Sequence, residues 1–271
     1  MSGGLSGSHN HTTFCDGGNT PREMIEAALA LGFSDIGFSA HKDPVIPLDE
    51  EAYLAALRAL QAAYAGRIRV AVGLEQDREA LTARRADYDY IIGSVHYLPA
   101  ADGALCAVDD QPARFAANLP RLGGAGAAVK AYYAAVADCA GRWRPQVIGH
   151  FDLICKNNAG GCLFDENASA YRRLALEALD ACIDAGCIVE LNTGGLFRGY
   201  RRRPYPALFL LRHLARRGGR VTINADAHET AALDYWFAPG RVLLRRAGFD
   251  SLAVLRDGKF VDEPLESPQT S

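Results

Sequence analysis

Residues 187–228 hold two short apolar segments, CIVELNT at 187–193 and VTINADAH at 221–228, with a helical segment at 206–217 between them. Both apolar segments are continuous runs rich in Val and Ile, which is typical of parallel strands buried on both faces. Two such strands joined by a helix form a βα unit. This stretch therefore predicts an α/β fold built on a parallel sheet.

The same alternation of strand and helix extends outward to both ends of the chain. Further strands are predicted just before His9 and at 35–40, 69–75, 90–96 and 147–152. Further helices are predicted from the N-cap Thr20 to Gly32, at 49–65, from residue 125 to about 143, and at 167–185. Seven strands separated by helices predict a seven-stranded (β/α) barrel, formed by residues 1–271 as a single domain.

Three segments stand outside this alternation. Residues 1–7, MSGGLSG, are rich in glycine and are expected to be flexible. Residues 99–125 contain Pro, Gly and Asp, so we expect an insertion made of a loop and a short helix. Residues 251–265, SLAVLRDGKFVDEPL, contain an Asp-Gly pair that predicts a terminal hairpin.

The composition excludes several classes of protein. The chain has 32 acidic and 29 basic residues, a net charge of -3, so its charge does not favour nucleic acid or an anionic membrane. The N-terminus lacks the features of a signal peptide, and no run approaches the ~18 apolar residues of a membrane span. Because the seven cysteines form no CxxC pair, we expect free thiols in a soluble, cytoplasmic protein.

Six of the seven histidines lie at or just past the ends of predicted strands. They are His9, His11, His41, His96, His150 and His228. Glu75 has the same position after its strand, and Asp226 precedes His228 in a DxH pair. The carboxyl ends of the strands in a βα barrel converge on one face, where active sites are built. We therefore expect these imidazoles and carboxylates to meet in one small volume.

Such a cluster would be costly to bury without a positive charge among its members. Divalent metals supply that charge, and imidazole with carboxylate suits Zn, Mn and Fe alike. The number of candidate ligands favours two or three ions rather than one. The seventh histidine, His213, lies within a predicted helix and is assigned no role.

These segments also carry a family resemblance. SHNHTTFCDG, IGFSAH, VGLEQD, IIGSVHYL, IGHFDL, VELNTGG and TINADAH follow in the order seen in the polymerase-and-histidinol-phosphatase (PHP) superfamily. Within it the chain looks most like the histidinol-phosphate phosphatases, from about residue 8 to residue 264. The resemblance implies a distorted seven-stranded barrel with a trinuclear metal site.

The resemblance also implies roles for individual residues. Glu75 matches a bridging carboxylate, and Asp16, in the CDG after the HxH pair, matches a position that often adds a ligand. Cys15 is expected to be a neighbour of the site rather than a ligand. The full set of implied metal ligands is His9, His11, Asp16, His41, Glu75, His96, His150, Asp226 and His228.

The expected reaction is hydrolysis of a small phosphate monoester, L-histidinol phosphate, in histidine biosynthesis. Metals would clamp the phosphoryl oxygens and activate a water for in-line attack. Asp226 and His228 are the candidates to protonate the leaving alkoxide. Arg198 and Lys156, each just past a strand end, are the candidates to bind the phosphate.

Two other interpretations remain open at this point. The chain could hydrolyse another monoester, such as a nucleotide or an oligonucleotide end, and Tyr200 to Arg203 with Tyr205 is the one hint of a groove for it. It could also be a metal-binding scaffold without catalysis, although no expected ligand is missing. Metal identity, oligomeric state, the residues that recognise the substrate's imidazole and amine, and a lid role for 99–125 are left open.

Overall fold

A computed structural model describes residues 4–265, and its centre is a sheet of seven parallel strands. The strands are β1 (Leu5–Gly7), β2 (Phe33–Lys42), β3 (Arg69–Asp77), β4 (Tyr90–Ser94), β7 (Val147–Ile148), β8 (Ile188–Asn192) and β9 (Val221–Asn224). They are hydrogen-bonded in the order β1-β2-β3-β4-β7-β8-β9. The predicted seven-stranded (β/α) architecture is confirmed.

The sheet nearly closes on itself through the segments that follow β1 and β9. Asn10 and Ala227 form an isolated parallel bridge. The backbone N–H of His11 donates to the Ala227 oxygen at 2.8 Å, and the N–H of Ala227 donates to the His9 oxygen at 3.2 Å. These bonds draw the HxH and DxH segments together, although the two are more than two hundred residues apart in the chain.

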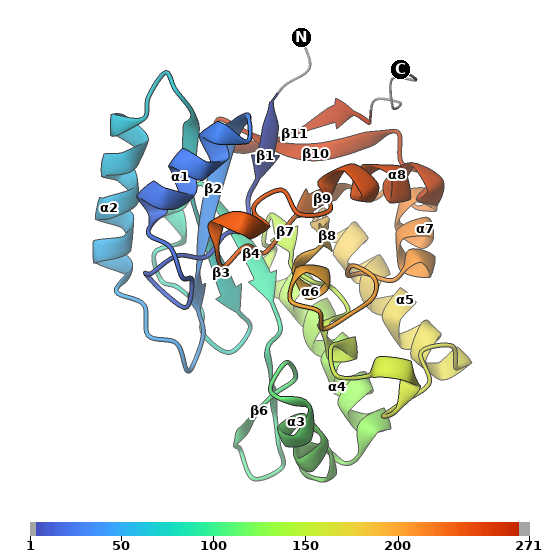
Figure 1. Cartoon of the computed structure of the whole chain (residues 1–271). Coiled ribbons are helices and arrows are strands. Elements are labelled where there is room, and N and C mark those ends of the chain that lie inside the picture. The colour runs from blue at the N-terminus through green and yellow to red at the C-terminus, as the bar shows by residue number, and fades with distance from the viewer. Residues whose placement is uncertain (1–3, 266–271) are drawn as a thin grey trace.

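Helices surround the sheet, as Figure 1 shows. They are α1 (Pro21–Ala30), α2 (Glu50–Ala63), α4 (Ala125–Asp138), α5 (Ser169–Asp184), the short α6 (Gly194–Phe197), α7 (Leu208–Arg216) and α8 (Phe237–Ala247). Helix α1 starts as predicted, because Thr20 and Glu23 form a reciprocal capping box. A π-helical turn, Cys139–Trp143, prolongs α4 to the predicted end. None of the helices in residues 4–265 is long and apolar enough to cross a membrane.

The predicted terminal hairpin closes the end of the barrel where the strands begin. Strands β10 (Ser251–Arg256) and β11 (Lys259–Pro264) pair antiparallel and lie across that end in Figure 1. Leu255 from the hairpin packs in a small apolar cluster with Tyr90. A Cβ on Gly37 or Gly73 would lie 2.3 Å or 2.2 Å from the Tyr90 side chain. Glycine at these two strand positions therefore makes room for the buried ring of Tyr90.

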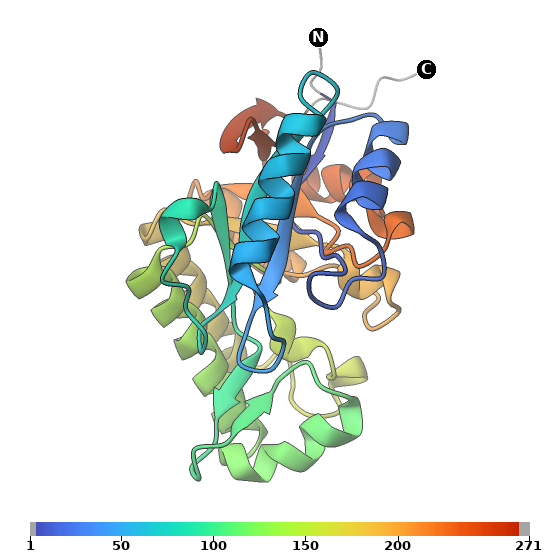
Figure 2. The same cartoon turned by 90° about the vertical axis from the view of Figure 1, so that its left-hand side faces the viewer.

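Two segments differ from the expectation. Residues 99–125 were expected to hold only loop and short helix, but β5 (Tyr97–Pro99) and β6 (Leu105–Ala107) form a hairpin before α3 (Pro112–Asn118). Burial of Leu98 and Cys106 in the pairing stabilises strands too short to show in the sequence. The hairpin and α3 project beyond the body of the barrel in Figure 2.

The expected flexible segment 1–7 also differs, because Leu5–Gly7 pair with β2 as the first strand of the sheet. Residues 1–3 lie outside the described part of the chain. The predicted strand at 147–152 is shortened to Val147–Ile148 because His150 turns the chain with a φ of 23°. That turn places the histidine at the mouth of the barrel instead of along its wall.

Candidate metal centre

The structure brings all of the implied metal ligands to the carboxyl ends of the strands. Their side chains form four overlapping groups whose potential ligand atoms lie within 4.8 Å of one another in each group. The groups are His11–Asp16–His41–His228, His9–His11–Asp226, His9–Glu75–His150 and His41–Glu75–His96. Together they contain the nine expected residues and no others among residues 4–265.

Glu75, near the end of β3, lies at the centre of this cluster and is fully buried. Its Oε2 is 2.9 Å from His41 Nδ1, and its Oε1 is 2.9 Å from His150 Nε2. Ser94 Oγ donates to the same Oε1 at 2.6 Å. The two carboxylate oxygens thus face different histidines, which is the geometry expected of a carboxylate that bridges two ions.

Asp226 approaches the HxH pair from the segment after β9. Its Oδ1 lies 3.3 Å from His11 Nε2 and 3.6 Å from His9 Nε2. Asp226 has a φ of 50° and His150 a φ of 23°, a region that non-glycine residues rarely adopt. Strained backbone of this kind persists where the surrounding structure enforces it, and it is concentrated at functional sites.

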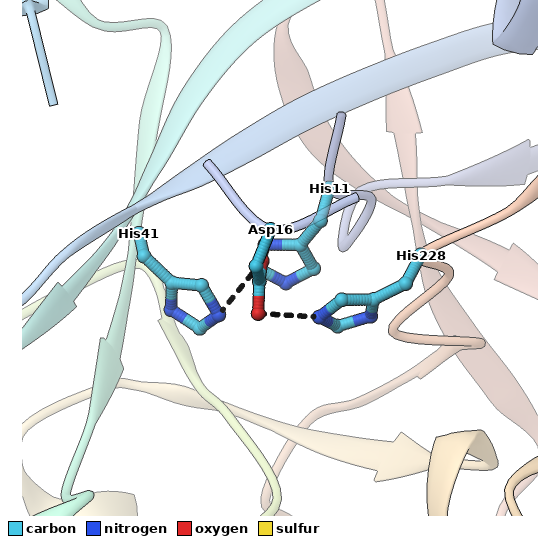
Figure 3. A group of neighbouring side chains, drawn as sticks. All are labelled: His11, Asp16, His41 and His228. Atoms are coloured by element: carbon cyan, nitrogen blue, oxygen red, sulfur yellow. Dashed lines mark ion pairs between the residues drawn. The ribbon is translucent and has the colours of Figure 1, made fainter. Parts of the chain in front are cut away.

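Asp16 lies between three histidines, as Figure 3 shows, and its side chain is 41% exposed. Its Oδ2 is 3.3 Å from His228 Nε2, and its Oδ1 is 3.6 Å from His41 Nε2. These imidazoles hold the pKa of Asp16 well below its ordinary value although burial opposes ionisation. Asp16 is therefore a charged carboxylate facing three ring nitrogens, as a ligand would be.

The side chains present fit a site for divalent cations. Within residues 4–265, His9 Nε2, His11 Nε2 and Glu75 Oε2 are buried without a hydrogen-bond partner, although each points toward the others. Buried polar atoms without partners are costly and rare in folded proteins. Imidazole nitrogens and carboxylate oxygens are also the donors that Zn, Mn and Fe accept. Bound cations would satisfy these atoms.

The electrostatics of His96 indicate the same need for positive charge. Burial opposes protonation of this imidazole, but Glu75 and Asp77 together raise its pKa to about 10. The surrounding carboxylates therefore favour positive charge at this position. Because metal ligands must shed such protons, metal binding here competes with protonation.

Two buried carboxylates support the cluster, and the sequence analysis did not single them out. Glu190, in β8, accepts from His9 Nδ1 at 2.7 Å and from the backbone N–H of His150 at 2.9 Å. Asp77 accepts from the backbone N–H of His96 at 2.7 Å. A carboxylate on Nδ1 leaves Nε2 of His9 free to face the site. A lone Glu within the apolar strand IVELN is the signal that could have indicated Glu190.

The two expected phosphate-binding cations line a cavity of about 220 Å³ above the cluster. Arg198 donates from Nη2 to Asp226 Oδ2 at 2.8 Å and from Nη1 to the Asp226 main-chain oxygen at 3.0 Å. These bonds leave other N–H groups of its guanidinium available to a ligand. Lys156 donates to the main-chain oxygen of Asp109 and lies 4.5 Å over the ring of Tyr200.

Other residues considered from the sequence lie outside the cluster. Arg201 and Arg203 both pair with Glu166, so two of the three arginines in the basic run are already engaged. His213 contacts Asp180 at 2.7 Å on the outer helices. Cys15 lies beside the site, with Sγ 3.6 Å from His11 Nδ1.

Comparison with known proteins identifies the class to which this fold and site belong. The PHP domain model matches residues 8–194. The chain belongs to the PHP domain family. A protein of Deinococcus radiodurans named "Probable histidinol-phosphatase" is 34% identical over 265 residues, covering 90% of this chain and 94% of that protein.

Two solved structures share the fold. A candidate histidinol phosphatase, HisK, from Listeria monocytogenes aligns with a TM-score of 0.75 at 18% identity, covering 87% of this chain and 99% of that one. Histidinol phosphate phosphatase from Lactococcus lactis, complexed with Zn, L-histidinol and phosphate, aligns with a TM-score of 0.69 at 22% identity, covering 94% and 98% of the two chains.

Proposed function

We propose that this chain is a metal-dependent phosphomonoester hydrolase that converts L-histidinol phosphate and water to L-histidinol and phosphate in histidine biosynthesis. The observation that carries the proposal is the convergence of nine imidazole and carboxylate side chains below a cavity with two cations. The choice of substrate is supported by the Deinococcus radiodurans protein named "Probable histidinol-phosphatase", which is 34% identical over almost the whole chain. The family resemblance of the GSVHYL and GHFDL segments supports it as well.

The donor groups are consistent with two or three divalent ions, with Zn, Mn and Fe all compatible. Glu75 and His9 each belong to two of the four groups, and so do His11 and His41, which favours ions placed close together. When bound, such ions would neutralise charge on the phosphoryl oxygens and acidify a water near phosphorus. Glu75 would hold two of them through its separate oxygens.

The chain's own residues would bind and orient the ester. Arg198 has unused N–H groups beside the cluster, and a guanidinium matches the geometry of phosphate. Lys156 offers a second cation that lines the same cavity. The ester oxygen must take up a proton when it leaves, since an alkoxide is a poor leaving group.

Two residues were expected to supply that proton, and their surroundings differ. Asp226 already accepts from Arg198 and faces His9 and His11, so its carboxylate has no place for a proton. His228 is partly exposed and lines the cavity. We therefore assign the orientation of Arg198 to Asp226. We place His228 among the metal ligands rather than assigning it the proton transfer, because its Nε2 faces Asp16 and its Nδ1 lies 3.1 Å from Arg198 Nη1.

Release of phosphate from L-histidinol phosphate tests this function, with nucleotides and sugar phosphates run in parallel. The enzyme would be assayed as purified, after chelation, and after addition of Mn, Zn or Fe. We expect a strong preference for histidinol phosphate, loss of activity on chelation and recovery with metal. Metal-dependent turnover of other esters alone would contradict the substrate, and bound metal without any turnover would indicate a scaffold.

Two further proposals concern the chain as a whole. We propose that residues 1–271 act as one domain, because the terminal hairpin packs against the barrel that the first strands begin. We also propose a cytoplasmic location, because all seven cysteines are free thiols and Cys162 is exposed.

A further inference from the structure

The segment 108–110, between β6 and α3, is fixed at the rim of the metal centre. The backbone N–H of Val108 donates to the main-chain oxygen of His96 at 2.8 Å. On the other side, Asn157 Nδ2 donates to the main-chain oxygen of Asp110 at 2.9 Å. Asp109, the residue between these anchors, is thereby held against the cavity beside His96.

Asp109 differs from every other carboxylate at this cavity. Asp16, Glu75 and Asp226 also line it, but all three belong to the metal-binding groups. Among residues 4–265, Asp109 is the one lining carboxylate outside those groups. Its side chain is 35% exposed, so its oxygens remain open to a ligand.

Lys156 forms only a long ion pair with the Asp109 carboxylate. Lys156 Nζ lies 3.8 Å from Asp109 Oδ2, beyond hydrogen-bond length. The same ammonium is anchored instead to the main-chain oxygen of Asp109 and to the face of Tyr200. Removing the Asp109 carboxylate would therefore leave Lys156 with its two main contacts.

The cavity thus presents cations and a carboxylate side by side. Arg198 and Lys156 suit a phosphate, and Asp109 suits a positively charged group close to that phosphate. L-histidinol phosphate has this pattern, because its phosphoester and its ammonium are on adjacent carbon atoms. A phosphate ester without an amine would leave Asp109 without a partner.

We propose that Asp109 accepts the substrate's ammonium group and is the residue that selects an amino-alcohol phosphate over esters lacking the amine. This inference rests on the proposed function. It names the residue that would recognise the ammonium group of the substrate in addition to its phosphate. The insertion that carries Asp109 is then the specificity element of the barrel.

The test compares Asp109→Asn with wild type on two esters: L-histidinol phosphate and 3-(imidazol-4-yl)propyl phosphate, which lacks only the amine. Replacement by Asn keeps the size of the side chain and removes its charge. A charge-assisted hydrogen bond contributes enough that the preference for the amino ester, as a ratio of kcat/KM values, is expected to fall about 10- to 100-fold. Metal content per chain is expected to equal that of wild type.

Asp110→Asn is the matched control. This variant removes the charge of the neighbouring carboxylate. Asp110 Oδ1 accepts from the backbone N–H of Gln111, and Asp110 does not line the cavity. We expect its ester preference to equal that of wild type.

Three outcomes would overturn the inference. An equal fall in kcat/KM on both esters would show that Asp109 acts through Lys156 or His96. Wild-type kcat/KM on both esters would show that the amine is bound elsewhere. Either result leaves histidinol phosphate turnover by wild type intact, so the proposed function survives it. Failure of wild type to hydrolyse either ester would instead overturn the proposed function, and this inference with it.

Discussion

The two ends of the barrel both bury charged side chains, but they balance that charge in opposite ways. At the end where the strands begin, Asp35 is almost fully buried, and Arg69 donates to both of its oxygens at 2.8 Å and 3.2 Å. The backbone N–H of Asp257, the hydroxyl of Ser34 and, at 3.4 Å, Nη1 of Arg256 also donate to it. At the end where the strands finish, Glu75 and its histidines leave several buried atoms without partners.

The difference separates a structural charge from a functional one. Asp35 is satisfied by residues of the chain, including the terminal hairpin, so it stabilises the closed end of the barrel. In the Glu75 cluster a bound cation would satisfy the buried atoms that the chain leaves without partners, because such atoms are unfavourable in a folded protein. Removing a carboxylate should therefore affect metal binding at one end and folding stability at the other.

The largest effect is expected for Glu75→Gln. An amide cannot bridge two cations, so we expect loss of more than one metal per chain and a fall in kcat of at least about 1,000-fold. Metal analysis of the purified variant measures this directly. Full metal occupancy in the variant would show that Glu75 is not the bridging group. Asp35→Asn, the same loss of charge at the other end, should keep its metals.

A smaller effect is expected for Glu190→Gln. Every group that contacts this carboxylate is a donor: His9 Nδ1, the His150 backbone N–H and the side-chain amides of Asn192 and Asn224. An amide nitrogen in place of one oxygen cannot accept a hydrogen bond from these donors. The bond that orients the His9 ring would therefore be weakened. We expect metal affinity about 10- to 100-fold weaker, measured by titration with a competing chelator.

The control for that variant is Glu177→Gln, a change on the exposed face of α5. Its metal affinity should equal that of wild type. Equal affinity in Glu190→Gln as well would limit Glu190 to a packing role.

For Arg198→Ala we expect KM for the ester to rise about tenfold or more, since a bidentate phosphate partner is lost. Metal content should stay at the wild-type level because Asp226 keeps its two histidine neighbours. Steady-state kinetics beside metal analysis separates these effects. An unaltered KM would show that Arg198 does not bind the phosphate and only hydrogen-bonds to Asp226.

The smallest effect on activity is expected for Asp35→Asn, which should change stability instead. Burial opposes ionisation of Asp35, but Arg69, the Asp257 N–H and Ser34 hold its pKa below the ordinary value. Loss of a buried charge-assisted bond costs about 2 kcal/mol in the free energy of unfolding at neutral pH. Denaturant unfolding with saturating metal measures the difference from wild type.

The sign of the pH dependence follows from that lowered pKa. The stabilisation by Asp35 is complete above its unfolded pKa, about 3.9, and is lost as pH falls through the lower folded value. The gap between wild type and Asp35→Asn should therefore be constant near neutral pH and shrink below about pH 4. A gap that stays constant into acid would contradict the charged role.

Much of this arrangement can be predicted from the sequence because the barrel turns strand ends into neighbours. His41, Glu75, His96 and His228 each follow an apolar run, so their convergence requires only the parallel topology. The supporting carboxylates are harder to find. Glu190 lies 181 residues from His9, and only the folded sheet shows that they touch.

The hairpin within the predicted insertion escaped prediction for a different reason. Strands β5 and β6 have three residues each, too few for their pattern to stand out, and packing against the core stabilises them. Asp109 is held in place by the bonds that its neighbours Val108 and Asp110 make to His96 and Asn157. Its own main-chain oxygen accepts from Lys156. Residues of this kind become visible once the fold is known.

The central claim is that the unsatisfied end of the barrel binds divalent cations. Its most direct test is elemental analysis of metal per chain, with the thermal unfolding midpoint recorded before and after chelation. The account predicts two or three divalent ions per chain and a lower midpoint once they are removed, because a ligand bound only to the native state stabilises it. A chain that binds no divalent metal at neutral pH, with an unchanged midpoint, would contradict it.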